Sequence, residues 1–290
     1  MAQELHFITG KGGVGKSTVA LAMAYKKSQE GKKVLLVELG DQSFYKEFLD
    51  LDEVGFNPTS LKKNLDISLW SGGDCLKEYA RHLLKIEGLY KLFFENPISK
   101  SLINVAPGLA EISITGKITS GPRHHGPQMK YDCLVIDAYA TGHFLSLIKA
   151  PAAMAQAINF GPMGEQNRGI DKILKDKNLC HYHIVTLPEE LPVKEAEELY
   201  AELKSFLGVQ PEFYINKILE THLTSPQLKK LAKDNSSLGE FAEYVEAVID
   251  RQEKACARLE KLKTKITKIS FVPENKAWKM MESISQELPS

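Results

Sequence analysis

The sequence predicts an α/β fold in which a mostly parallel sheet of about seven or eight strands lies between two layers of helices. Short β-rich runs alternate along the chain with stretches of helical spacing, which is typical of parallel strands joined by helices. Several of these runs, such as 34–37 and 133–136, are apolar at every position. Continuous apolarity indicates strands buried on both faces, so we expect three layers, with a helical subdomain on one side.

The first half of the chain contains the more regular strand and helix signals. The first helix is expected to follow a glycine-rich loop and to end near Glu30, because Gly31 suits the position just after a helix. Helical spacing recurs over 75–92, whereas 97–118 is interrupted by a Pro-Gly pair. The runs predicted to form strands over the whole chain are 5–8, 33–38, 66–70, 131–136, 181–186, 212–215 and 268–272.

The second half is predicted to be rich in helices. The segment 144–180 reads as helical with a break at Gly-Pro, and it is either a helix that binds a partner or a cap on the core. A further helix is expected over 188–207. Ser237 and Glu240 match a capping box that starts a long helix. Its apolar stripe is expected to pack in the core, and it consists of Phe241, Tyr244, Val245, Val248 and Ile249.

Length and composition bound the number of domains and the class of partner. The chain has 290 residues, 43% hydrophobic and 26% charged, which is enough for one large or two modest domains. We expect a single domain over 1–290, with helical elaborations at about 75–130, 144–178 and 224–262. Lys+Arg and Asp+Glu both number 37, so no basic excess indicates nucleic acid or an anionic membrane surface as a partner.

Cysteine and histidine usage gives little sign of a metal-binding or disulfide framework. Adjacent His124 and His125 lie in a Gly/Pro-rich loop, where a metal site and a solvated pair are both possible. The cysteines are far apart and form no CxxC pair, which favours reduced thiols in a cytoplasmic protein; they are Cys75, Cys133, Cys180 and Cys256. No signal peptide is expected, and no apolar run approaches the roughly 18 residues that cross a membrane.

The glycine-rich loop between the first strand and the first helix is the main functional motif. The G-x-G-x-x-G pattern of 10–15 fits a dinucleotide fingerprint, with Glu38 as the acid that would bind the ribose. The G-x4-G-K-S pattern of 10–17 fits the P-loop of nucleoside triphosphate-binding proteins. Lys16 and Ser17 favour the P-loop, because a triphosphate site needs a cation for the phosphates and a hydroxyl for Mg²⁺. A dinucleotide site needs neither group.

Three further positions are expected to complete a nucleotide site. A P-loop protein needs a second acid near Mg²⁺, and Asp137 follows the buried run 131–136. Gly142 lies shortly after it and is placed to contact the γ-phosphate through its N–H group. Asn216 follows the run 212–215 at the carboxyl end of the sheet, where it either recognises adenine or forms a turn.

Several motifs resemble the deviant Walker-A ATPases, and within them the ArsA and Get-type targeting ATPases. The P-loop carries the additional lysine of that class, Lys11. The segment beginning at Asp137, D-A-Y-A-T-G-H, resembles the D-T-A-P-T-G-H segment of the family. Similar stretches follow in the family's order at 185–192, 214–216 and 271–273, so the resemblance covers most of the chain. It implies a three-layer P-loop NTPase fold.

The resemblance also implies roles for individual residues in binding ATP or ADP and Mg²⁺. Lys11 would reach across a homodimer to the nucleotide of the partner, and Lys16 would contact the phosphates. Ser17 and Asp137 would hold Mg²⁺. The other nucleotide-binding positions are Gly12, Gly13, Val14 and Gly15 around the phosphates, Thr18 at the α-phosphate, Gly142 at the γ-phosphate, and Asn216, Val272 and Pro273 at the base.

The chain departs from the family pattern in the switch after the second strand. The family places a water-orienting aspartate there, and by strict spacing that position is Gly40. Either Asp41 takes over this catalytic role with a local shift, or hydrolysis is slow. The sequence lacks the zinc-binding cysteine pair of the targeting ATPase, and it lacks a cysteine cluster that could bind arsenite. Its 7 methionines are scattered, whereas a groove that binds apolar tail helices is expected to be rich in Met. Both well-known activities of the family are therefore disfavoured.

The sequence supports two functional hypotheses above the others. The first is a dimeric ATPase whose hydrolysis cycle opens and closes the dimer and so controls a protein partner. The second is a slow or non-hydrolysing nucleotide-dependent scaffold that pairs with itself or with a related chain. A nicotinamide-dependent enzyme is disfavoured by Lys16 and Ser17, and an oxyanion pump subunit is disfavoured by the missing cysteines.

Overall fold

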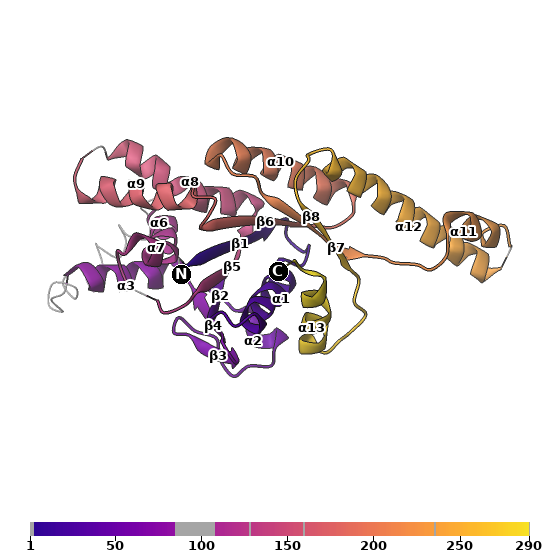
Figure 1. Ribbon diagram of the computed structural model, residues 1–290, viewed down its shortest axis with the longest axis horizontal. Helices are drawn as coiled ribbons and strands as arrows, with labels where there is room; N and C mark the ends of the chain where they lie inside the picture. Colours follow the sequence, from indigo (N-terminus) through magenta and orange to yellow (C-terminus); the bar gives the residue numbers. More distant parts are fainter. Residues whose placement is uncertain (1–2, 85–107, 128, 159, 235, 290) are drawn as a thin grey trace.

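A single eight-stranded sheet forms the centre of the molecule (Figure 1). The computed structural model describes residues 3–84, 108–127, 129–158, 160–234 and 236–289. The strand order is β3-β4-β2-β5-β1-β6-β7-β8, and every neighbouring pair is parallel except β3 with β4. The strands are β1 (Glu4–Gly10), β2 (Val34–Leu39), β3 (Thr59–Lys62), β4 (Leu65–Trp70), β5 (Cys133–Ala140), β6 (Cys180–Thr186), β7 (Glu212–Ile218) and β8 (Ile266–Ser270).

Helices cover both faces of this sheet (Figure 1). α1 (Lys16–Gln29) and α13 (Ala277–Glu287) pack together on one face, next to the short α2 (Phe44–Phe48). The other face carries α8, α9 and α10, with α6 beside them. The remaining helices in the described residues are α3 (Gly72–Leu84), α6 (Leu109–Ile118), α7 (Ser120–Arg123), α8 (Thr141–Ala157), α9 (Pro162–Leu174), α10 (Glu190–Leu207), α11 (Ser225–Leu231) and α12 (Ser237–Glu260). The predicted three-layer α/β fold is confirmed.

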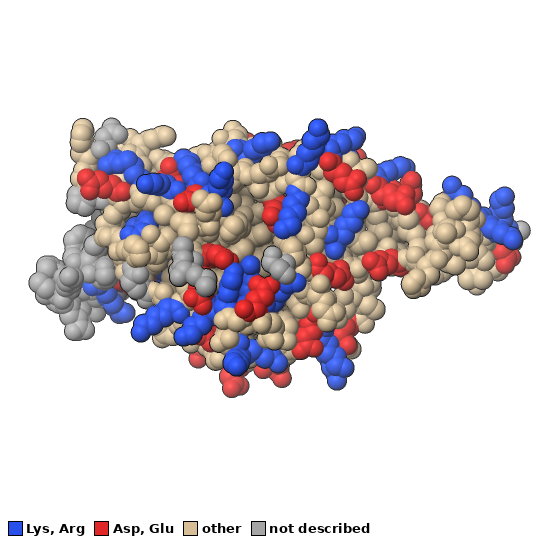
Figure 2. Space-filling model, in the orientation of Figure 1, with Lys and Arg blue, Asp and Glu red and all other residues tan. Residues whose placement is uncertain are grey.

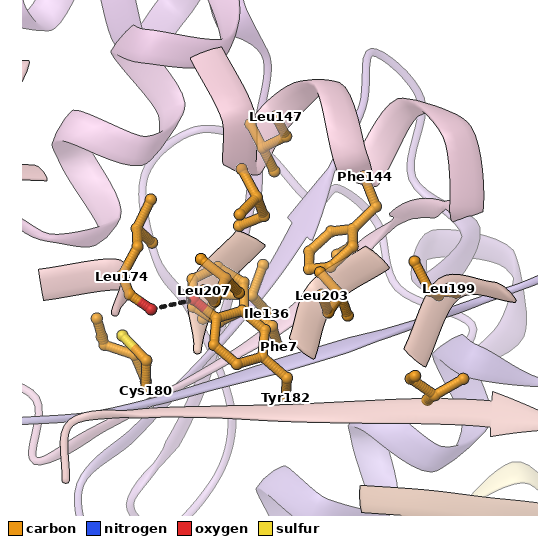
Figure 3. Close-up of a cluster of buried hydrophobic side chains, with 14 of the residues drawn as sticks. Phe7, Ile136, Phe144, Leu147, Leu174, Cys180, Tyr182, Leu199, Leu203 and Leu207 are labelled. Carbon is orange, nitrogen blue, oxygen red and sulfur yellow. Dashed lines mark hydrogen bonds between the residues drawn. The ribbon is translucent and has the colours of Figure 1, made fainter. Parts of the chain in front are cut away.

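Alternating side chains of the buried strands form two separate cores. On the α8–α10 side, the rings of Phe7 and Tyr182 stack with centroids 5.1 Å apart, and Phe144 packs against both (Figure 3). The Tyr182 hydroxyl donates to the backbone carbonyl of Leu174 over 2.6 Å, which satisfies its only buried polar group. In the opposite core, side chains of α1 and α13 pack against Ile8 and other strand residues.

Each predicted strand overlaps an observed strand, with ends that differ by a few residues. β3 was not predicted, because its residues Thr59–Lys62 are largely exposed and carry no apolar run. The predicted helical patterns at 75–92 and 97–118 lie partly outside the described residues, which exclude 85–107. The segment 144–180 divides into α8, α9 and the first residue of β6.

The expectations for two helical stretches have different outcomes. α8 buries Phe144, Leu147, Ile148 and Pro151 in the core, so its first three turns cap the sheet, as one of the two interpretations required. The predicted core stripe of α12 is wrong. Phe241 is 62% and Tyr244 is 61% exposed, because α11 and α12 pack on each other and extend away from the sheet (Figure 1).

Two smaller sequence interpretations are also settled. The predicted capping box at the start of α12 is wrong, because Ser236 occupies the N-cap position and makes no side-chain capping bond. Within the described residues, no helix combines the length and the apolar content needed to cross a membrane. Charges of both signs are interspersed over the face shown in Figure 2, in agreement with the zero net charge.

Candidate functional site

The glycine-rich loop joins the end of β1 to the start of α1 at the carboxyl edge of the sheet. Gly13 and Gly15 have φ angles of 83° and 91°, a region that favours glycine. A Cβ atom on Gly15 would lie 2.3 Å from Nδ2 of Asn216, and one on Gly10 would lie 2.1 Å from the backbone oxygen of Val185. The loop is therefore packed against β6 and β7 so closely that only glycine fits at these two positions.

Asn216 fastens this loop to β7. Its side chain is buried, and its Nδ2 donates to the backbone carbonyl of Val14 over 2.9 Å. Its Oδ1 accepts from the backbone N–H of Lys217 over 2.9 Å. Asn216 also lines a cleft of about 580 Å³. Both amide atoms thus have backbone partners while the residue remains at the wall of a ligand-sized cleft.

This cleft is where the predicted base-binding residues meet. Thr18 of α1 and Asn216 of β7 lie on its walls with Val272 and Pro273, which follow β8. Phe48 of α2 also lines it. The cleft opens beside the first turn of α1, so a nucleotide with its phosphates at that turn would extend its base into the cleft.

Lys16, Ser17 and Asp137 come together below the loop. The Lys16 ammonium donates to the backbone carbonyl of Lys11 over 3.1 Å. Burial lowers the pKa of Lys16, and the charge of Asp137 opposes that shift. Burial raises the pKa of the Asp137 carboxyl, whereas hydrogen bonds from Ser17 and Tyr45 and the charge of Lys16 lower it. A hydroxyl and a buried carboxylate beside a phosphate cradle fit the oxygen-only preference of Mg²⁺.

Glu38 is a second buried acid in this region, and it is the Cα partner of Asp137 in the β2–β5 pair. Its carboxylate accepts from the Ser43 hydroxyl over 2.5 Å and from the backbone N–H of Phe44 over 2.6 Å, so it supports the start of α2, whose N-cap residue is Ser43. Burial raises the pKa of Glu38 and Asp137 adds to that shift, whereas the two capping bonds lower it. Glu38 therefore anchors the switch segment, while Asp41 next to Gly40 is exposed.

Tyr45 of α2 connects the segment after β2 to Ser17 and Asp137, and it was missed from the sequence. Its side chain is fully buried, and its hydroxyl lies 2.8 Å from the backbone oxygen of Ser17 and 3.0 Å from Oδ2 of Asp137. Burial, with the neighbouring acids adding to it, raises the pKa of Tyr45 well above its usual value, so the phenol keeps its proton as a donor. The sequence held no signal for it, because the contact joins residues that are far apart in the chain.

Lys11 lies on the exposed side of the loop and pairs with Glu195 of α10. The Lys11 ammonium and Oε1 of Glu195 are 2.5 Å apart, and both side chains are more than a third exposed. Glu195 was also missed from the sequence, where it is one of several acids of α10. Gly12 and Gly13 are exposed beside Lys11, and Gly142 is exposed near the start of α8. The carboxyl edge thus gathers every predicted site residue around one region.

Comparison with known proteins gives a consistent result. A family model described as anion-transporting ATPase matches residues 3–163. The ATPase BagA of Mycobacterium tuberculosis is 29% identical over 241 residues, which cover 79% of this chain and 69% of the relative. A putative arsenical pump-driving ATPase of Aquifex aeolicus is 27% identical over 248 residues, covering 73% of this chain and 79% of the relative. An ATPase ASNA1 homologue of Paramecium tetraurelia is 24% identical over 249 residues, with 73% and 74% covered.

Proposed function

The chain belongs to the anion-transporting ATPase family, and on that premise we propose that it is a dimeric ATPase whose nucleotide cycle controls a protein partner. ATP hydrolysis follows from the family, whereas dimer opening and closing and the control of a partner are the proposal. The supporting observation is that Lys16, Ser17 and the buried Asp137 converge beneath a glycine cradle at the start of α1. We treat 1–290 as one ATPase domain.

The residues around the glycine-rich loop would have different roles in binding the nucleotide and Mg²⁺. N–H groups of the loop and the first turn of α1 bind phosphate oxygens, and Lys16 adds a point charge. Ser17 and Asp137 would hold Mg²⁺, which when bound neutralises charge on the β- and γ-phosphates. Thr18 and Gly142 would contact the α- and γ-phosphates. Thr18, Asn216, Val272 and Pro273 line the cleft that would receive the base.

Lys11 supports the dimeric part of the proposal. Within one chain it pairs with Glu195, and an exposed pair of this kind contributes only about 0.2–1 kcal/mol. A triphosphate in a second copy offers several negative charges, so it would outcompete a single partly exposed carboxylate. A cation supplied in trans is worth on the order of 10³–10⁵ in the rate of phosphoryl transfer. Lys11 therefore couples turnover to assembly of two copies.

The switch segment supports the alternative of slow turnover. Gly40 occupies the position where an aspartate was expected, and the neighbouring Asp41 is exposed. The carboxylate of Glu38 already accepts hydrogen bonds from Ser43 and Phe44 at the start of α2. Asp41 is therefore the acid of this segment that would orient an attacking water. If Asp41 does not take this role, the protein acts as a nucleotide-dependent scaffold that pairs with itself or with a related chain.

We propose an unidentified protein partner and no nucleic acid, because the charge is balanced. A cytoplasmic location is proposed from the cysteines: Cys75, Cys133, Cys180 and Cys256 are all free and buried.

The proposal is tested by measuring phosphate release and assembly state together, on one preparation. We expect Mg²⁺-dependent turnover that Lys16→Ala abolishes, and a dimer by light scattering with ATP but not with ADP. Lys11→Ala should lose turnover while ATP still raises the melting temperature, since Lys11 acts on the other copy. Turnover that equals the Lys16→Ala background would refute hydrolysis, and unaltered turnover in Asp41→Ala would remove Asp41 from the mechanism.

A further inference from the structure

A cluster of metal-ligating side chains lies at the amino edge of the sheet, the end opposite to the nucleotide cradle. Glu4 and His6 are on β1, and Cys133 begins β5. One ligand atom from each residue lies within 4.8 Å of the other two. Glu4 and Cys133 are Cα partners in the parallel β1–β5 pair, which places their side chains on one face, and His6 shares that face by its spacing. No function proposed above uses these residues.

The three side chains have different surroundings. His6 and Cys133 are buried, whereas Glu4 is partly exposed beside a cleft of about 320 Å³. His181 and His183 of β6 line the same cleft. Cys133 does not line this cleft, which is large enough to admit an ion with bound water and gives it a path from solvent to Glu4 and His6.

The distances suit a tetrahedral ion after a small adjustment. Nε2 of His6 and Oε2 of Glu4 are 3.3 Å apart. Two ligands of a tetrahedral Zn²⁺, each about 2.0–2.2 Å from the ion, lie about 3.3–3.5 Å from each other. The widest separation in the cluster, at most 4.8 Å, would need to shorten by about 1 Å. The side chain of Glu4 is partly exposed and can move toward an ion held by the other two ligands.

His183 is placed to orient His6. A ligating histidine needs a hydrogen-bond partner for its second ring nitrogen. Nδ1 of His6 is 3.0 Å from Nε2 of His183, and the two rings are nearly parallel with centroids 5.3 Å apart. His183 is itself buried, and its Nδ1 makes no hydrogen bond, being 3.7 Å from Oε2 of Glu212. A neutral His183 with its proton on Nδ1 would accept the N–H of His6, which leaves Nε2 of His6 free for an ion.

We propose that Glu4, His6 and Cys133 bind a divalent transition metal ion of the Zn²⁺ type, with water as fourth ligand and His183 orienting His6. Carboxylate, imidazole and thiolate are the donors that Zn²⁺ accepts, and a site with a thiolate disfavours Mg²⁺ and Ca²⁺. Among the described residues this is the one group of three such side chains within ligand distance. Within the described part of the chain, the pair His124–His125 belongs to no such group.

Binding requires the loss of one proton and the displacement of one cation. The S–H bond of Cys133 breaks as the metal–sulfur bond forms, because thiolate is the ligand, and the proton leaves to solvent. Lys32 contacts both Glu4 oxygens at 2.7 Å, and Lys27 lies 3.8 Å from one of them. Lys32 is partly exposed and competes with the metal for Glu4. A variant without the Lys32 charge should therefore bind the metal ion more tightly.

Co²⁺ binding to tag-free protein, after treatment with a chelator, tests the proposal. We expect one equivalent of CoCl₂ to produce the near-ultraviolet thiolate-to-Co²⁺ band, and ZnCl₂ to remove it by competition. Cys133→Ser should abolish the band. Cys180→Ser is the matched control, because Cys180 lies at the same edge of the sheet on the opposite face, and it should keep the band.

Two further variants separate a metal site from a general structural effect. His183→Gln should weaken Co²⁺ binding by about 10–100-fold with the band retained. Lys32→Gln should tighten Co²⁺ binding by about two- to fivefold, because it removes a cation that competes for Glu4 through a weak, partly exposed ion pair. If Cys133→Ser fails to fold by circular dichroism, Glu4→Gln takes its place and should weaken binding. A wild-type protein without the band, or a band that survives Cys133→Ser, overturns the proposal.

Discussion

The hydroxyl of Tyr45 is expected to stabilise the contact between α2 and the carboxylate of Asp137, and Tyr45→Phe isolates its effect. The ring is fully buried and keeps its packing, so only the hydroxyl is lost. That hydroxyl contacts the backbone oxygen of Ser17 at 2.8 Å and Oδ2 of Asp137 at 3.0 Å. A hydrogen bond to a charged group contributes about 1.5–3 kcal/mol, and its loss leaves a buried acceptor unpaired. We therefore expect the free energy of unfolding to fall by about 1.5–3 kcal/mol.

The assay is thermal unfolding of the nucleotide-free protein by circular dichroism. For a chain of 290 residues the loss corresponds to a melting temperature lower by about 2–5 °C. Tyr244→Phe is the control, since Tyr244 is 61% exposed, and its melting temperature should stay within about 1 °C. Because the bond is strong only to ionised Asp137, the difference between wild type and Tyr45→Phe should shrink as acid protonates Asp137. A shift equal to that of the control would refute the hydrogen bond.

The same substitution has a functional readout. If Tyr45 holds Asp137 in place, Tyr45→Phe should raise the Mg²⁺ concentration for half-maximal turnover by about 10-fold, as for other residues that orient metal ligands. The turnover at saturating Mg²⁺ should change much less. An unaltered Mg²⁺ dependence combined with a lower melting temperature would assign Tyr45 to stability alone.

Three further predictions concern the cradle and its neighbours. Glu195→Gln should lower the ATP concentration for half-maximal dimerisation by about two- to fivefold, because it releases Lys11 from an exposed ion pair. An unchanged midpoint by light scattering would show that this pair has no role in dimerisation. Asn216→Ala should reduce the thermal shift caused by ATP more than the shift caused by GTP. An equal reduction of both shifts would limit the role of Asn216 to its hydrogen bond with the backbone carbonyl of Val14. Gly15→Ala should abolish stabilisation by ATP, because its Cβ would lie 2.3 Å from Asn216; a normal ATP-dependent shift would contradict the close packing.

Much of the sheet could be predicted because its central strands are uniformly apolar. The run 133–136 is buried at every position and cannot be confused with a surface segment. β3 and α2 carry no such signal. β3 is an exposed edge strand, and α2 is a five-residue helix whose start depends on the carboxylate of Glu38. Elements that are defined by one tertiary contact leave no periodic pattern in the sequence.

The error at α12 has a different physical origin. Apolar residues at helical spacing show that a helix has an apolar face, but they do not show what covers that face. Phe241 and Tyr244 are spaced as core residues and yet are exposed, because the helix extends beyond the sheet. In the site, the motif residues Lys16, Ser17 and Asp137 could be predicted from local spacing. Tyr45 and Glu195 could not, because their contacts join distant segments whose approach is set by the complete fold.

The two ends of α1 explain why one sheet can carry both the nucleotide cradle and the proposed metal site. The positive end of the helix dipole lies at Lys16, where the phosphate-binding loop meets the first turn. The negative end lies about 20 Å away, at the last turn with Lys26 and Lys27, beside the cleft that holds Glu4 and His6. An anion at the first end and a divalent cation at the second are each stabilised by the same helix. The separation exceeds two Debye lengths at physiological salt, so the two ligands should bind nearly independently.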